Sequence, residues 1–125
     1  MTLDCNGAGE RHTVIGNTAE KGMFVVDGTR LFWIESPGLI RSAAPGAVES
    51  DIVTLASAQG PVSLAVDAEH VSWTNGDGTI RSVARNGGMP VTIASDQSGA
   101  RGIALRGRRL YWANAGDGTI RSAPN

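Results

Sequence analysis

Cysteine is nearly absent from this chain of 125 residues, because Cys5 is the single one, and this excludes an intrachain disulfide and a cysteine metal cluster. Eleven basic residues nearly balance twelve acidic ones, and the net charge of −1 gives no reason to expect nucleic acid or anionic lipid as a partner. No apolar run is long enough to span a membrane, and the first residues lack the basic start and apolar core of a signal peptide.

Residues that could carry catalysis are also sparse. His12 and His70 are far apart in the sequence, so neither has a local partner for acid–base work or metal binding. Ser72, Ser82 and Ser122 have no recognisable base, and no nucleophile elbow or phosphate loop occurs. The sequence therefore predicts a protein that is not an enzyme, with no catalytic residues, no cofactor and no metal site.

The chain does have a repeat of about forty residues. The hexapeptide Asp77–Ser82 returns unchanged as Asp117–Ser122, and a weaker copy occupies Gly38–Ser42. Each copy follows a tryptophan at nearly constant spacing, and these tryptophans are Trp33, Trp73 and Trp112. Because a structural repeat cannot bury its own apolar face alone, its stability depends on its neighbours. Repetition therefore explains most of these residues without reference to chemistry.

One repeat unit contains four short apolar runs separated by Gly, Asp, Asn or Pro, which is typical of strands joined by tight turns. The segment Asn75-Gly76-Asp77-Gly78 is a strong hairpin signal, since these residues accept the positive φ of primed turns. The expected strands of the second unit, A to D in order, are 63–66, 71–74, 79–84 and 91–94.

Four antiparallel strands in each repeat are typical of a β-propeller blade, so the predicted fold is all-β. Apolar runs without a 3.6-residue period argue against a helical solenoid. Two units are whole and a third lacks its strand D, while a segment near the amino terminus matches a strand D without a blade. The predicted organisation is a disordered leader 1–11, an orphan strand D 12–16, and blades 22–56, 62–94 and 102–125.

The strings Val71–Asn75, Leu110–Asn114 and Leu31–Glu35 resemble the YWTD repeat of low-density-lipoprotein-receptor class B propellers. The following Gly-Thr-Ile-Arg and Val-Thr-Ile-Ala patterns are similar to "YWTN" tandem repeats of bacterial, often secreted, proteins. The resemblance covers about residues 13–125 and implies a six-bladed propeller in which the motif residues are structural. It also implies a location outside the cell, either extracellular or periplasmic.

Three blades are too few to close a ring, since propellers have typically four to eight. Two copies would supply six blades, with each amino-terminal strand completing the last blade of the other copy. The sequence thus suggests a homodimer, and the alternative is a segment cut from a longer propeller.

The end face formed by the B–C and D–A loops is the candidate binding surface. Its residues are short and polar, and they are Asn75, Asp77, Asn114, Asp117, Asp96, Gln97 and Gln59. The aspartates could bind calcium or act as turn formers, and the turn role is favoured because each loop offers few oxygen groups. The repeated arginines, Arg41, Arg81 and Arg121, are expected to be structural parts of each blade.

The predicted function is a non-enzymatic module that recognises a protein or a glycan through this end face. The loops lack the Trp, Tyr and Arg that anchor strong protein interfaces, which favours weak binding. The alternatives are an enzyme of lyase or hydrolase type with a site on the propeller axis, and a lectin with the same site in each repeat.

Overall fold

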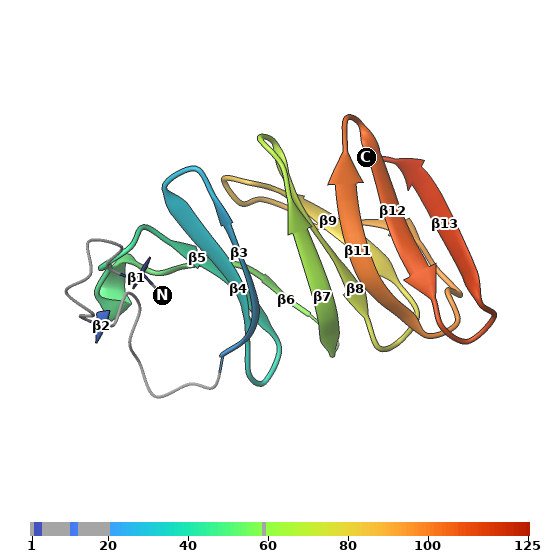
Figure 1. The fold of residues 1–125 in the computed structure, drawn as a ribbon, viewed down its shortest axis with the longest axis horizontal. Helices are drawn as coiled ribbons and strands as arrows, with labels where there is room; N and C mark the ends of the chain where they lie inside the picture. Colours follow the sequence, from blue (N-terminus) through green and yellow to red (C-terminus); the bar gives the residue numbers. More distant parts are fainter. Residues whose placement is uncertain (1, 4–10, 13–20, 59) are drawn as a thin grey trace.

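In the computed structural model, which describes residues 2–3, 11–12, 21–58 and 60–125, the chain forms consecutive antiparallel sheets (Figure 1). Blade 1 contains four strands, β3 (Lys21–Asp27), β4 (Arg30–Glu35), β5 (Leu39–Ala43) and β6 (Val53–Ser57). Blade 2 contains β7 (Pro61–Val66), β8 (His70–Asn75), β9 (Ile80–Ala84) and β10 (Val91–Ala94). Blade 3 has three strands among the described residues, β11 (Ala100–Arg106), β12 (Arg109–Asn114) and β13 (Thr119–Pro124). The predicted all-β fold of propeller blades is confirmed.

Two shorter elements accompany the blades. A 3-10 turn, η1 (Glu49–Asp51), lies between β5 and β6, and a two-residue pair joins β1 (Thr2–Leu3) to β2 (Arg11–His12). Apart from His12, the expected orphan strand 12–16 lies outside the described residues, as do residues 4–10 of the expected leader. Within the part of the chain that the structure describes, no helix is long and apolar enough to cross a membrane.

The B–C hairpin forms where it was expected, but its turn is of a different kind. Asn75 and Asp77 have no positive φ, and within the turn only Gly78 takes one, at 89°. The amide of Gly78 donates to the carbonyl of Asn75 (3.1 Å), and the amide of Asn75 donates to the carbonyl of Thr79 (2.9 Å). This pattern is a type I turn followed by a left-handed glycine, one of the common longer hairpin loops. The expected primed turn is therefore wrong.

The aspartate of the repeat explains why the longer turn is stable. Asp77 Oδ1 accepts hydrogen bonds from the amide (3.0 Å) and the hydroxyl (2.6 Å) of Thr79. In blade 3, Asp117 accepts the same two bonds from Thr119, at 3.1 and 2.6 Å, although that loop is one residue longer. A side chain that bonds the backbone two residues ahead fixes a turn locally. The conserved spacing of Asp and Thr within the chain thus preserves the start of strand C.

The blades stack face to face, and their contacts form the core. Between blades 1 and 2, Phe32 and Ile40 pack with Leu64, Val71 and Trp73. Between blades 2 and 3, Ile80 packs with Ala100, Leu110 and Trp112 in the same way. Because both faces of blade 2 are covered, consecutive residues of β7, β8 and β9 are buried, instead of every second one. The repeat therefore buries its apolar residues between units, as its sequence requires.

The repeated arginines lie directly across from the repeated tryptophans on neighbouring strands, as the pairs Trp33–Arg41, Trp73–Arg81 and Trp112–Arg121. Arg41 donates to the carboxylate of Glu35 (2.6 Å), and Arg81 donates to the carbonyl of Pro90 (3.3 Å). These contacts lie inside single blades. They support the structural role that the sequence suggested for the arginines.

Candidate functional site

The B–C and D–A loops meet at one end of the molecule, which we call the loop face. Its described residues are 36–38, 58, 60, 76–78, 95–99 and 115–118. Backbone hydrogen bonds join these loops in series. Ala58 donates to Gly38, Gly76 donates to Gly60 and Gln97 donates to Gly78, at 2.7, 2.8 and 2.9 Å. Gly116 then donates to Ser98 at 2.9 Å. The loop face is thus one connected surface that crosses both blade boundaries.

Close approach of these loops explains why glycine recurs in them. A Cβ atom at Gly38 would lie 2.7 Å from the carbonyl oxygen of Ala58, and one at Gly116 would lie 2.0 Å from the hydroxyl of Ser98. Both distances are shorter than real Cβ contacts, so a larger residue would push the loops apart. The glycines are therefore part of the support of this face and carry no binding chemistry.

Two of the predicted site residues are buried below the loop face. Asn75 and Asn114 are 1% and 2% exposed, so neither side chain can reach a partner. Asn75 Nδ2 donates to the hydroxyl of Thr79 (3.0 Å), and Asn114 Nδ2 donates to Gln97 Oε1 (2.8 Å). We therefore remove both asparagines from the candidate surface and assign them to the support of the turn.

Gln97 is also occupied by structural bonds. Its Oε1 accepts from the indole of Trp112 (3.1 Å) as well as from Asn114, and its amide nitrogen donates to the carbonyl of Ser95 (2.8 Å). In blade 1 the acceptor for the tryptophan indole is Glu35, whose carboxylate accepts a hydrogen bond from Trp33 at 3.0 Å. Gln59, which was predicted as part of the surface, lies outside the described residues. Gln97 therefore serves chiefly to join the D–A loop to blade 3.

Three aspartates remain exposed on the loop face, namely Asp77, Asp96 and Asp117. No other described residue of the loop face is charged. Asp96 is also the single non-glycine residue with a positive φ, 59°, in the described part of the chain. The hydroxyl of Thr119 lowers the pKa of Asp117 below its ordinary value of 3.8, and the Thr119 amide and the Arg121 charge act in the same direction. The loop face is therefore negatively charged at neutral pH.

These aspartates do not gather into a cation site. Among the residues that the structure describes, no three His, Cys, Asp or Glu side chains lie close enough together to hold a metal ion. Asp77 and Asp96 border a shallow, open depression of about 370 Å³ that is otherwise lined by Gln97, Ser98 and glycines. Since Asp77 and Asp117 each bond a threonine of their own turn, the turn-forming role favoured from the sequence agrees with the geometry.

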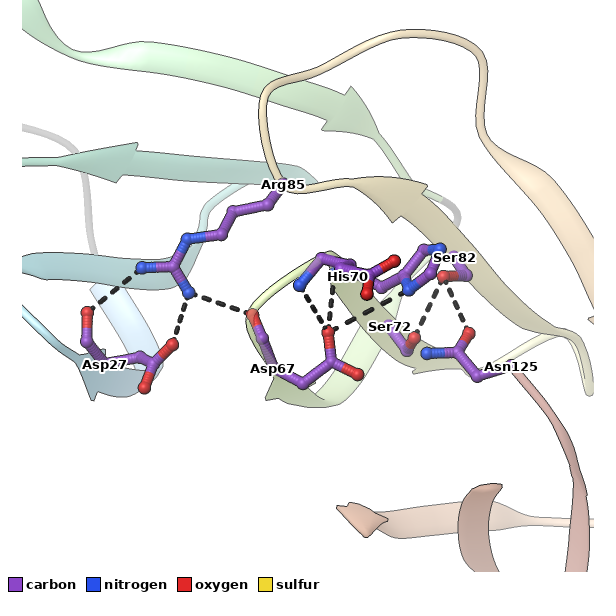
Figure 2. Close-up of polar contacts among 8 residues, drawn as sticks. Asp27, Asp67, His70, Ser72, Ser82, Arg85 and Asn125 are labelled. Atoms are coloured by element: carbon purple, nitrogen blue, oxygen red, sulfur yellow. Dashed lines mark hydrogen bonds and ion pairs between the residues drawn. The ribbon is translucent and has the colours of Figure 1, made fainter. Parts of the chain in front are cut away.

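The opposite end of the molecule holds a polar network that the sequence did not reveal (Figure 2). Arg85 of blade 2 forms an ion pair with Asp27 of blade 1 and donates to the carbonyl of Asp67 (2.9 Å). Its guanidinium also lies over the ring of Phe32, 4.8 Å from the centroid. Asp67 in turn accepts from the backbone amide of His70 (2.6 Å). This arrangement ties the two blades together at their A–B turns.

Serines in the same region are used for structure as well. The hydroxyl of Ser72 donates to Ser82 (3.0 Å), and that of Ser82 donates to the Asn125 side chain (3.2 Å), as Figure 2 shows. Both serines are buried, so Ser72 is not presented to solvent as a nucleophile. No sequence signal would have identified this network, because Arg85 and Asn125 are not repeated in the other units.

Comparison with known proteins supports the fold and leaves the family open. No protein-family model and no curated protein matches the chain. A chain in the crystal structure of a nidogen/laminin complex is 26% identical over 78% of this chain and 41% of its own length, with a TM-score of 0.65. The computationally designed Ika8 protein is 18% identical over 87% of this chain and 34% of its own, with a TM-score of 0.69.

A third solved structure, the computationally designed Ika4 protein, is 12% identical over 92% of this chain and 99% of its own, with a TM-score of 0.54. At these identities the two designed proteins show likeness of fold alone. This chain spans less than half the length of the first two matched chains. Together with the sheet order, these similarities identify the structure as a partial β-propeller.

Proposed function

We propose that this chain is a non-enzymatic binding module that recognises a basic surface of another protein through the loop face. The observation that carries the proposal is the charge of that face, where three exposed aspartates stand on a connected loop framework. Arg121 of β13 forms an ion pair with Asp117 at 3.8 Å, and the face keeps a net negative charge. Like charges on one face attract a partner of opposite charge and speed its encounter. The partner is thus a protein segment rich in lysine or arginine.

The likeness to a chain from a nidogen/laminin complex supports a role in protein binding, since that structure is a complex of two proteins. The loop face has no exposed aromatic or arginine anchor among its described residues, so its affinity is expected to be weak. Binding that depends mainly on exposed charges weakens with added salt. The proposed interaction is therefore transient and sensitive to salt.

We further propose that the repeats belong to the YWTD type and that two copies complete a six-bladed homodimer. The repeat strings and the propeller fold support this assignment. Such an assembly would present two loop faces of identical charge, and two linked sites raise the avidity of a weak contact. Glycan binding is the alternative use of the same face.

A photo-crosslinking amino acid in place of the exposed Ser95 tests the proposal, since this position lies on the loop face and leaves all three aspartates intact. The same group in place of the exposed Glu69, on the opposite end, is the matched control. The intact chain is incubated with an extract of its source cells and the linked proteins are identified. We expect a protein captured from position 95 and not from position 69, and we expect D77N and D117N together to reduce the capture.

High salt should reduce the same capture. Equal capture from both positions, or capture that the two substitutions leave unchanged, would contradict the proposal. Binding on a glycan array without any protein capture would favour the glycan alternative.

A further inference from the structure

One face of blade 3 is exposed where the same face of blades 1 and 2 is buried. Ile40 and Ile80 are both 0% exposed, whereas Ile120, at the same position of the repeat, is 74% exposed. Tyr111 is 37% exposed, although Ser72 at its position in blade 2 is fully buried. An open depression of about 330 Å³ lies over this face and is lined by Gly102, Ile103, Ala104, Tyr111, Trp112, Ala113 and Ile120.

The structure itself shows what covers this face in the other blades. Strand β7 of blade 2 packs on β3 and β4 of blade 1, and β11 of blade 3 packs on β7 and β8 of blade 2. In each case the first strand of the following blade is the cover. Leu64 of β7 lies in the core between the first two blades, and Ile103 of β11 packs on the core between the last two. An apolar A strand is therefore the natural complement of the exposed face.

The chain has one A strand whose outward side is free. Phe24 and Val26 of β3 hold the repeat positions of Leu64 and Val66, and they are 55% and 60% exposed. The neighbouring Leu31 and Trp33 are covered by Ala47 and Ile52 of the β5–β6 connection, so β3 is the open part of this side. Blade 1 thus offers the surface that blade 3 lacks.

The outer edge of β13 points to the same partner. In blades 1 and 2, strand C pairs with strand D, with Ser42 opposite Val53 and Ser82 opposite Val91. Ser122 occupies that position in β13, and β13 has no strand on this edge among the described residues. An unpaired edge of this kind accepts an extended strand from another chain.

The two free surfaces lie at opposite ends of the row of blades, so one molecule cannot join them (Figure 1). We propose that the outer face of β11–β13 is the docking surface for β3 of a second copy of this chain. The contact repeats the blade-to-blade contact that the chain already makes twice. Since each copy carries both surfaces, a pair of copies can use each surface once in a closed arrangement. This inference rests on the homodimer proposed above, for which it names the contact, and it is independent of binding at the loop face.

The mass of the intact chain in solution tests the proposal, measured by light scattering at micromolar concentration. We expect the mass of two chains for the wild type and of one chain for I120D, because an aspartate would be buried in the contact. Met89→Asp is the matched control, since Met89 is exposed and lies between β9 and β10 of blade 2, which are not part of either surface. This variant should still have the mass of two chains. A folded wild-type monomer would overturn the proposal, as would loss of the pair in M89D.

Mixing two variants tests which surfaces meet. F24D should also be monomeric, because it damages the other half of the contact. A mixture of I120D and F24D should form pairs again, since the β3 surface of the first and the β13 surface of the second are intact. Failure of the mixture to pair, with both variants shown to be folded by circular dichroism, would exclude this head-to-tail contact. Photo-crosslinking at position 95 gives no information on these masses, so binding at the loop face and this contact between copies fail separately.

Discussion

Blades 2 and 3 contain the same hexapeptide, Asp77–Ser82 and Asp117–Ser122, in contrasting environments. Ile80 is fully buried, while Ile120 is mostly exposed. Thr74 donates its hydroxyl to the carbonyl of Arg101 in the next blade (2.8 Å), whereas no described strand packs beyond Ala113, which stands at the position of Thr74. The turn contacts of the two hexapeptides are the same. The difference shows that a turn depends on its own residues, whereas burial depends on the following blade.

The largest effect should come from truncating the two isoleucines. Ile80→Ala deletes buried methyl groups and should lower the free energy of unfolding by about 2–5 kcal/mol. Ile120→Ala at a concentration where the chain is monomeric should change it by less than about 0.5 kcal/mol, as for most exposed positions. Urea denaturation of both variants at low protein concentration measures the difference. Equal losses would show that the third blade is covered in the monomer.

Gln97→Ala should have the next largest effect, about 1–3 kcal/mol of stability, because the indole of Trp112 and the amide of Asn114 would be left buried without their acceptor. Gln97→Glu retains an oxygen acceptor and serves as the control. Thermal unfolding followed by tryptophan fluorescence measures both variants. A Gln97→Ala variant as stable as the wild type would mean that water replaces the side chain at this junction.

The contact between Thr74 and Arg101 should contribute less. Thr74→Val removes a single hydrogen bond between blades and should cost about 0.5–1.5 kcal/mol. The reciprocal change, Ala113→Thr, adds a hydroxyl where no blade follows and should leave stability unchanged in the monomer. Urea denaturation of the pair checks this asymmetry. A loss in Ala113→Thr comparable to that in Thr74→Val would contradict it.

The smallest expected effect concerns pH. The folded-state pKa of Asp117 is lowered, so its charge favours the folded state above the ordinary pKa of 3.8, and this contribution is lost as the pH falls through the folded value. Asp117→Asn removes the charge and retains an oxygen for the turn. The wild type should therefore be slightly more stable than the variant at neutral pH, and the difference should shrink in acid. A melting-temperature difference that is independent of pH would exclude this origin.

The strand order of the blades could be predicted from the sequence because strands and turns depend on neighbouring residues. Valine-rich runs bounded by Gly, Asn and Asp specified β10 at its observed bounds, Val91–Ala94, and the Asp-Gly pair specified the B–C hairpin. The turn type was predicted incorrectly, because Asp77 accepts hydrogen bonds from Thr79 and does not take the positive φ that the residue types alone suggested.

The candidate site could be predicted only in part. The sequence correctly predicted that the B–C and D–A loops share one end of the molecule, since these loops hydrogen-bond to one another there. Which side chains face solvent was not predictable, because Asn75 and Asp77 are similar polar residues two positions apart, yet Asn75 is buried and Asp77 is exposed. The Arg85–Asp27 pair was also missed, since its partners are 58 residues apart and Arg85 is not repeated in the other units.

The sequence by itself determined the repeat, its four-strand unit, the missing fourth strand of the last unit and the Asp-Gly turns. Each of these depends on side chains within a few residues, where local sterics and hydrogen bonds decide the conformation. Only the tertiary structure decided which faces are buried, which loop residues are exposed and which arginine joins two blades. These properties depend on contacts between blades. The identical hexapeptides of blades 2 and 3 therefore have different surroundings, because blade 3 covers the first and no described strand covers the second.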